Sequence, residues 1–179
     1  MLAIKLIFRK SDGRVIGAQA LGLDGVDKRI DAFAMAIQAG LTIYDLEESE
    51  LTYAPQFGGA KSPVNFAGMV AADVLREDMP IAHWQNLPES AFLLDVRYPQ
   101  ELAMEKASGV VNIPLPELRN RLKELPKDRE IYVVCRSGQR AYYATRILLQ
   151  NGFQVRNISG GMMTHSVFLR EETVAGTLY

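Results

Sequence analysis

The chain has 179 residues, of which 48% are hydrophobic and 23% charged, and this is enough for one large or two small globular domains. The formal net charge is -1 and no long run of one sign occurs, so a nucleic-acid or membrane-surface binder is not expected. A single cysteine and two distant histidines give no metal-ligand spacing. One cysteine excludes an internal disulfide, and no apolar stretch approaches the roughly 20 residues that cross a bilayer, which together favour a cytoplasmic protein.

A β-hairpin followed by a helix is predicted at the start of the chain. Apolar residues alternate over residues 4–8, and a second apolar run covers residues 15–22. Asp12-Gly13 separates the two runs, and this dipeptide is typical of a tight hairpin turn. Apolar residues then recur at helical spacing over residues 26–37, and Gly40 marks the end of that helix.

The rest of the first half is predicted to contain two more helices joined by a loop. Thr42 starts a short helix, and Asp45 three residues later completes a capping box. Residues 51–65 are rich in Pro and Gly and lack periodicity, so we expect a surface loop there. Ser62-Pro63 is typical of an N-cap followed by proline in the first turn of the next helix. A polar, proline-marked stretch ends that helix, and we place a domain boundary near Asp78.

Short apolar runs alternate with helical patterns in the second half, which predicts a mostly parallel β-sheet flanked by helices. The predicted strands are residues 92–96, 110–113, 131–134 and 153–155, and the predicted helices are residues 99–104, 116–125, 138–151 and 161–170. Active sites of such sheets lie beyond the carboxyl ends of the strands. Cys135 follows the third strand directly and therefore falls at such a position.

Cys135 is the strongest candidate for a catalytic residue. It lies between a strand and a helix, in a loop whose backbone N–H groups can curl toward the sulfur. Arg136 and Arg140 add two positive charges, and with the helix N-terminus they favour a thiolate over a thiol. A free cysteine at a strand end can equally be a buried structural residue. The cationic turn around Gly138 favours the functional interpretation, because a passive strand end has no need of one.

The run Cys135-Arg136-Ser137-Gly138-Gln139-Arg140 resembles the active-site loop of the rhodanese family of sulfurtransferases. Three further segments resemble motifs of that family in the same order, namely Asp95-Val96-Arg97 with Pro99-Gln100-Glu101, Val111-Asn112-Ile113-Pro114 and Ser159-Gly160-Gly161. The resemblance covers about residues 81–169. It departs from the family pattern at residues 105–109 and at Met162, where an aromatic residue is common.

This resemblance implies sulfur transfer. It implies that Cys135 attacks a sulfane donor, holds the sulfur as a persulfide inside the loop and passes it to a thiol acceptor. The resemblance implies substrate-binding roles for Arg136, Ser137, Gly138 and Gln139, and catalytic roles for Cys135, Arg140, Asp95 and Arg97. The expected substrates are small sulfur compounds, such as thiosulfate, a persulfide, a polysulfide or coenzyme A persulfide.

Cysteine phosphatases are the nearest competing assignment, because they place the same strand, loop and helix around a phosphate. Their signature has five residues between cysteine and arginine, whereas four separate Cys135 from Arg140. The shorter loop makes a smaller cradle, suited to one sulfur atom rather than a phosphoryl group. Val134 also stands where that family usually has histidine. These differences favour sulfur transfer.

The first half resembles the dimerisation domain of pyridine-nucleotide disulfide oxidoreductases over about residues 3–71. Residues 5–8 and 13–19 carry the match, and residues 53–65 narrow it to the coenzyme A-disulfide reductase branch. The sequence departs from the family pattern at Gln56 and Ser62, where proline and aspartate are usual. Some members of that branch carry a C-terminal rhodanese domain, so both halves of the chain point to the same kind of enzyme.

In that family the matching loop reaches the flavin site of the partner subunit, which implies that Tyr53 assists chemistry at a redox cysteine. The alternative is that Tyr53 only packs at an interface. No Gly-x-Gly-x-x-Gly fingerprint follows a strand and no second cysteine exists, so the chain itself is expected to bind no FAD, NAD(P)H or metal. FAD, NAD(P)H and coenzyme A are implied for a longer parent enzyme, of which this chain is expected to be the C-terminal piece.

The predicted architecture is an α+β dimerisation domain over residues 1–78 and an α/β rhodanese-like domain, with a central parallel sheet flanked by helices, over residues 79–179. The leading hypothesis is a sulfurtransferase module that feeds persulfide sulfur to a flavin-dependent coenzyme A-disulfide or coenzyme A-persulfide reductase site, in a homodimer. The alternative is a non-catalytic dimerisation and docking module that binds coenzyme A species without turnover.

Overall fold

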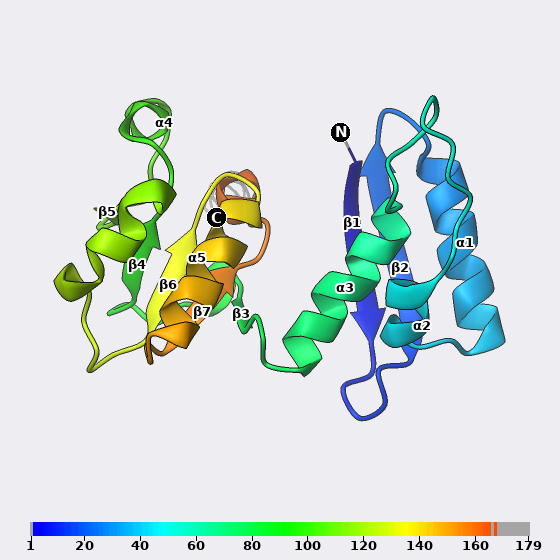
Figure 1. Cartoon of the computed structure of the whole chain (residues 1–179), viewed down its shortest axis with the longest axis horizontal. Helices are drawn as coiled ribbons and strands as arrows, with labels where there is room; N and C mark the ends of the chain where they lie inside the picture. The colour runs from blue at the N-terminus through cyan, green and yellow to red at the C-terminus, as the bar shows by residue number, and fades with distance from the viewer. Residues whose placement is uncertain (1, 166, 168–179) are drawn as a thin grey trace, which may run out of the picture. The chain divides into compact units, whose positions relative to one another are not determined.

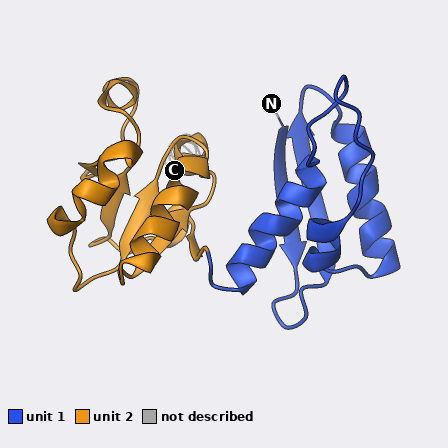
Figure 2. Ribbon diagram, in the orientation of Figure 1, with its two compact units in different colours: residues 1–78 blue, residues 79–179 orange. Residues whose placement is uncertain are grey.

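The computed structural model describes residues 2–165 and residue 167. The chain divides into two compact units, Met1–Asp78 and Met79–Tyr179, which Figure 2 shows in separate colours. Each unit has a hydrophobic core of its own. Within the described residues, no helix combines the length and the apolar character needed to cross a membrane.

The first unit contains an antiparallel hairpin, as the sequence predicts (Figure 1). β1 (Leu2–Phe8) pairs with β2 (Val15–Gly22), and the turn between them contains Asp12-Gly13. Successive residues of β1 alternate between partly buried and exposed, because neighbouring side chains of a strand point to opposite faces. The inward face packs against α1 (Val26–Ala39), and this helix ends at Gly40 as predicted.

Two shorter helices complete the first unit, and both begin at the predicted caps. α2 (Ile43–Glu48) starts after Thr42, whose backbone N–H donates to the Asp45 carboxylate at 2.7 Å while its hydroxyl accepts from the Asp45 N–H at 3.3 Å. α3 (Pro63–Leu75) starts after Ser62 with a second capping box. These helices bury the core residues that the hairpin alone would leave exposed, and the core consists of Val15, Phe33, Ala36, Ile43, Leu46, Val64, Ala71 and Ala72.

A five-stranded parallel sheet forms the centre of the second unit, which confirms the predicted fold class (Figure 1). Its spatial order is β3-β7-β6-β4-β5, and the strands are β3 (Ile81–Ala82), β4 (Phe92–Asp95), β5 (Val111–Asn112), β6 (Ile131–Val134) and β7 (Val155–Ile158). The sequence did not predict β3, which is only two residues long. The strand predicted over residues 153–155 begins later, at Val155. Phe153 still belongs to the end of the preceding helix, because its N–H bonds the Leu148 carbonyl.

The helices of the second unit agree with the sequence in two places and differ in one. α4 (Pro99–Met104) and α5 (Gln139–Gln150) lie where they are predicted. The predicted helix over residues 116–125 is wrong: the segment forms two 3₁₀ pieces, η2 (Leu115–Asn120) and η3 (Leu122–Glu124), separated at Arg121. Its N–H groups bond carbonyls three residues earlier, which is 3₁₀ geometry. A further short 3₁₀ helix, η1 (Trp84–Asn86), follows β3. Of the predicted helix 161–170, residues 161–165 are helical, while residues 166 and 168–170 lie outside the described residues.

Both faces of the sheet in the second unit are covered, and β6 shows this most clearly. Ile131, Val133 and Cys135 belong to the core cluster that faces α5, whereas Tyr132 and Val134 belong to the cluster on the opposite face. This two-residue period is the expected alternation of side chains along a strand. The side chain of Cys135 is therefore directed to the α5 face at the point where β6 ends.

Candidate functional site

Cys135 follows the last residue of β6 directly and precedes the start of α5. Figure 1 labels both elements. The cysteine is only 1% exposed. Its Sγ accepts the backbone N–H of Gly138 at 3.2 Å and that of Ala141 at 3.4 Å. Burial alone would fit a structural cysteine as well, but two converging N–H donors give the sulfur a polar environment that suits negative charge.

The sulfur takes the place that a capping side chain usually occupies at a helix start. Gly138 is the N-cap of α5 and has no side chain to satisfy the first N–H groups of the helix. Sγ accepts one of these groups, the N–H of Ala141. The φ of Gly138 is 101°, in the left-handed region that favours glycine, and this conformation directs its own N–H to the sulfur. The chain thus uses Cys135 to start α5, and the helix N-terminus brings positive potential to Sγ.

The loop also holds N–H groups that remain available. Within the described residues, the backbone N–H groups of Arg136, Ser137, Gln139 and Arg140 make no hydrogen bond. Successive N–H groups of this kind form a concave site for an anionic or electron-rich atom. The loop therefore offers N–H donors to an electron-rich atom placed beside Sγ.

The segment that follows β7 bonds the backbone at the start of the loop. The N–H of Met162 donates to the Cys135 carbonyl at 2.9 Å, and the N–H of Met163 donates to the Arg136 carbonyl at 3.0 Å. Gly161 makes this approach possible, because a Cβ at that position would lie 2.2 Å from the Cys135 carbonyl oxygen. Trp84 fixes the glycine in turn by donating from Nε1 to the Gly161 carbonyl at 3.0 Å. Met162 is 2% exposed and belongs to the core cluster facing away from α5.

Arg140 is paired rather than free. Its guanidinium makes a bidentate ion pair with the Glu101 carboxylate, at 2.6 and 2.7 Å. Hydrogen bonds from Arg140 are the main reason that the pKa of Glu101 falls from its ordinary value of 4.5 to about 2, and the same bonds raise the pKa of Arg140. Sequence reasoning counted Arg140 as a positive charge near the thiol, and it named Glu101 only as part of a family motif. The pairing links α4 to the first turn of α5 beside Cys135.

This ion pair predicts a specific pH dependence. The pKa of Glu101 is depressed in the folded protein, so the stability it contributes is present above about pH 4.5 and is lost as the pH falls toward about 2. Glu101→Gln removes this contribution. We expect the difference in urea midpoint between the wild type and Glu101→Gln, followed by Trp84 fluorescence, to be largest at neutral pH and to shrink below pH 4.5. A difference that stays constant down to pH 2 would contradict the assignment.

Asp95 and Arg97 form a buried pair at the end of β4, the neighbour of β6. Asp95 is 0% and Arg97 3% exposed. The carboxylate accepts from Nη2 of Arg97 at 2.7 Å, and from Nε at 3.0 and 3.1 Å, while Nη2 also donates to the Glu105 carbonyl at 2.8 Å. Between them, the N–H of Val96 donates to the carbonyl of Val134, directly before Cys135. The structure therefore places the two charged residues next to the loop, where they bond each other.

The other predicted site residues lie in two places. Arg136, Ser137 and Gln139 belong to the loop, and their side chains are exposed. Tyr53 lies in the first unit, in the segment between α2 and α3, and is 57% exposed. Sequence reasoning did not identify Glu101, Trp84 or Asn157 of β7 as parts of the site. Glu101 lies in one of the family motifs, but no local pattern marks its contact with Arg140, because all three residues reach the loop or the Gly161 segment only through the tertiary fold.

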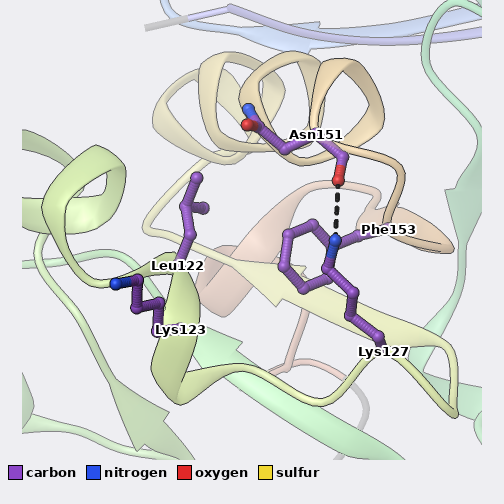
Figure 3. Close-up of a pocket in the computed structure, with 5 residues that line it drawn as sticks. All are labelled: Leu122, Lys123, Lys127, Asn151 and Phe153. Atoms are coloured by element: carbon purple, nitrogen blue, oxygen red, sulfur yellow. Dashed lines mark hydrogen bonds between the residues drawn. The ribbon is translucent and has the colours of Figure 1, made fainter.

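A shallow pocket lies at the other end of the second unit, and Figure 3 shows its lining. It is formed by Leu122, Lys123, Lys127, Asn151 and Phe153, which precede β6 or follow α5. The ammonium group of Lys127 lies 4.9 Å from the centre of the Phe153 ring and donates to the Asn151 carbonyl at 3.3 Å. The pocket is at the amino ends of the strands, whereas Cys135 is at the carboxyl ends, so it is separate from the sulfur site.

Comparison with known proteins agrees with this geometry. The model of the rhodanese-like domain matches residues 80–164. A sulfurtransferase of Allochromatium vinosum is 37% identical over 76 residues, which are 42% of this chain and 71% of that protein. The chain belongs to the rhodanese-like family. The matched residues lie within the second unit, and they include the cysteine loop described above.

The first unit carries a second family match. The model of the pyridine nucleotide-disulphide oxidoreductase dimerisation domain covers residues 2–62. Two solved structures resemble both units together. The reduced Bacillus anthracis protein CoADR-RHD is 44% identical with a TM-score of 0.91, and 95% of this chain and 31% of that chain are covered. A NAD-dependent persulfide reductase from A. fulgidus is 41% identical with a TM-score of 0.81, covering 90% and 29% respectively. The chain thus spans less than a third of the length of either structure.

Proposed function

We propose that this chain is a rhodanese-type sulfurtransferase that carries sulfur as a persulfide on Cys135. The observation that carries the proposal is the convergence of the Gly138 and Ala141 N–H groups on Sγ, at 3.2 and 3.4 Å. The N–H groups of Ser137 and Gln139, which make no hydrogen bond in the described part of the chain, support it because they can hold the transferred sulfur. The sulfurtransferase name of a 37% identical relative points the same way.

The reaction has two displacement steps. The Cys135 thiolate attacks the sulfane sulfur of a donor such as thiosulfate, so that an Sγ–S bond forms, the S–S bond of thiosulfate breaks and sulfite leaves with the bonding electrons. A nucleophile, either cyanide or an acceptor thiolate, then attacks the outer sulfur. The Sγ–S bond breaks in that step and the Cys135 thiolate is restored. Backbone N–H groups stabilise the negative charge on sulfur in each state.

The residues around the thiol have different proposed roles. Arg136, Ser137, Gly138 and Gln139 supply the N–H groups and the exposed rim that bind the sulfur substrate. Arg140 positions the first turn of α5 through its pair with Glu101. Asp95 and Arg97 fix the backbone at the end of β4 through their mutual hydrogen bonds, and the Val96 N–H between them bonds the Val134 carbonyl of β6. In this scheme Cys135 is the nucleophile.

We further propose that the sulfurtransferase works as part of a larger flavin-dependent reductase. The support is that both units together resemble a NAD-dependent persulfide reductase and the protein CoADR-RHD. In such an enzyme the persulfide would come from a coenzyme A persulfide or polysulfide, and Tyr53 of one subunit would act near the flavin of its partner in a homodimer. The sequence contains no Gly-x-Gly-x-x-Gly motif, and no strand of the described part of the chain is followed by such a turn, so these residues do not fit a dinucleotide pyrophosphate. FAD and NAD(P)H are therefore assigned to the rest of such an enzyme.

Incubation of the 179-residue chain with thiosulfate and cyanide tests the proposed function. We expect thiocyanate to form catalytically. With thiosulfate alone, we expect intact-protein mass spectrometry to show a mass gain of one sulfur atom that dithiothreitol removes. The alternative, a dimerisation and docking module without turnover, predicts neither signal, and their joint absence would reject sulfur transfer.

A further inference from the structure

Asn157 is a buried polar residue of β7 that no sequence motif marks and that contacts the sulfur loop. It is 4% exposed, and β7 lies between β3 and β6 in the sheet. Its backbone N–H donates to the Pro80 carbonyl at 2.8 Å. Its side-chain Nδ2 donates to the Gly138 carbonyl at 3.1 Å and to Sδ of Met79 at 3.4 Å. The residue is thus held on an internal strand of the sheet, next to β6, and its amide reaches the loop.

The bond to Gly138 determines how one peptide group of the loop is oriented. The Gly138 carbonyl accepts from Asn157 and also from the Tyr142 N–H at 2.8 Å, so two donors hold it in place. This carbonyl shares a peptide group with the N–H of Gln139. All peptide bonds of the described chain are trans, and in a trans peptide the C=O and N–H point in opposite directions. Pulling the carbonyl toward the sheet therefore turns the Gln139 N–H away from it, to the open side of the loop.

The Gln139 N–H is one of the loop donors without a partner among the described residues. The two N–H groups that bond Sγ belong to Gly138 and Ala141, which are different peptide groups. The Gln139 peptide is thus free to serve the outer sulfur rather than Sγ. Asn157 affects this peptide by bonding its carbonyl, and it does so without contacting the sulfur itself.

We propose that Asn157 is a positioning residue for the persulfide: its amide fixes the Gly138–Gln139 peptide so that the Gln139 N–H meets the transferred sulfur. The inference rests on the proposed function, because a loop that carries no sulfur has no outer atom to position. Gly138 has a left-handed φ and no side chain, so it restricts the rotation of this peptide less than any other residue would. The orientation of the peptide therefore depends on the donors that bond its carbonyl.

Two variants and one control test the proposal in the whole chain. Asn157→Ala removes the amide, and Asn157→Thr removes it while keeping a residue that suits a strand. Met79→Leu is the matched control, because it removes the second acceptor of the same Nδ2 and leaves the Gly138 contact in place. Each protein is measured for sulfur loading from thiosulfate by mass gain, and for alkylation of Cys135 by iodoacetamide. Alkylation needs Sγ but no site for an outer sulfur.

We expect Asn157→Ala and Asn157→Thr to load sulfur about tenfold more slowly, because misplacing the Gln139 N–H weakens one hydrogen bond to the transferred sulfur. Alkylation should change less than twofold, and Met79→Leu should match the wild type in both assays. Any of three results would overturn the inference. Loading and alkylation could slow equally, a folded Asn157 variant could load sulfur at the wild-type rate, or both Asn157 variants could unfold while Met79→Leu folds. A wild type that takes up no sulfur would instead reject the proposed function.

Discussion

Cys135→Ser is expected to abolish both thiocyanate formation and the mass gain from thiosulfate. Serine forms no persulfide, and its hydroxyl is a weak nucleophile at neutral pH without an adjacent base. The change should leave the fold in place, because the serine oxygen can still accept the N–H groups of Gly138 and Ala141 that Sγ accepts now. The measurement is the thiocyanate assay together with intact-protein mass, on a variant whose urea midpoint is close to that of the wild type.

Cys135→Ala is the control that separates chemistry from helix capping. It loses the sulfur and also the acceptor at the start of α5, where Gly138 offers no side chain. Losing an N-cap acceptor costs about 1 kcal/mol, so the alanine variant should be less stable than the serine variant while both are inactive. Sulfur uptake by either variant would show that the carrier is not residue 135. Equal stability of the two would show that Sγ does not act as a cap.

Local patterns were enough to predict most elements of the fold. Thr42 with Asp45 and Ser62 with Pro63 give capping signals that operate within a few residues, so the starts of α2 and α3 follow from sequence alone. The parallel sheet follows from buried apolar runs alternating with helices. The segment around Arg121 was mispredicted because its four leucines follow α-helical spacing, while each pair of leucines three residues apart also fits one of the two short 3₁₀ pieces that form.

The candidate site was predictable only where it is continuous in sequence. The loop from Cys135 to Arg140 carries its own signature, and the structure places it at the carboxyl end of β6 as expected. Glu101 lies 39 residues from Arg140, and Trp84 lies 77 residues from Gly161, so nothing local connects them. Those contacts depend on the order of the strands. This is why the charge on Arg140 was predicted and its pairing was not.

The same dependence on strand order explains how the sheet controls the loop. β4 and β7 flank β6, and the chain that follows each of them contacts the loop or its base. The Val96 N–H bonds the Val134 carbonyl on one side, and the Met162 N–H bonds the Cys135 carbonyl on the other. Each bond fixes the backbone within one residue of the thiol. The position of the sulfur is therefore set by the sheet rather than by the loop residues alone.

The largest loss of stability is expected for Asp95→Ala. This change leaves the Arg97 guanidinium, 3% exposed, without the carboxylate that accepts from both Nε and Nη2. Removing one partner of a buried ion pair costs about 3–5 kcal/mol, because the remaining charge stays desolvated. Trp84 is the only tryptophan of the chain and lies in the second unit, so its fluorescence in urea reports the unfolding of that unit.

Two further variants show whether the loss of stability in Asp95→Ala comes from the Arg97 charge that is left without its partner. The double variant Asp95→Leu with Arg97→Met removes both charges, and it should recover much of the stability that Asp95→Ala loses. Glu117→Gln breaks an ion pair with Arg121 on the surface and should change the urea midpoint little, because exposed pairs contribute little. A double variant no more stable than Asp95→Ala would mean that the pair contributes through its hydrogen bonds to the end of β4. In that case Asp95 and Arg97 would be holding the backbone next to Cys135 directly, and sulfur loading should fall in both variants alike.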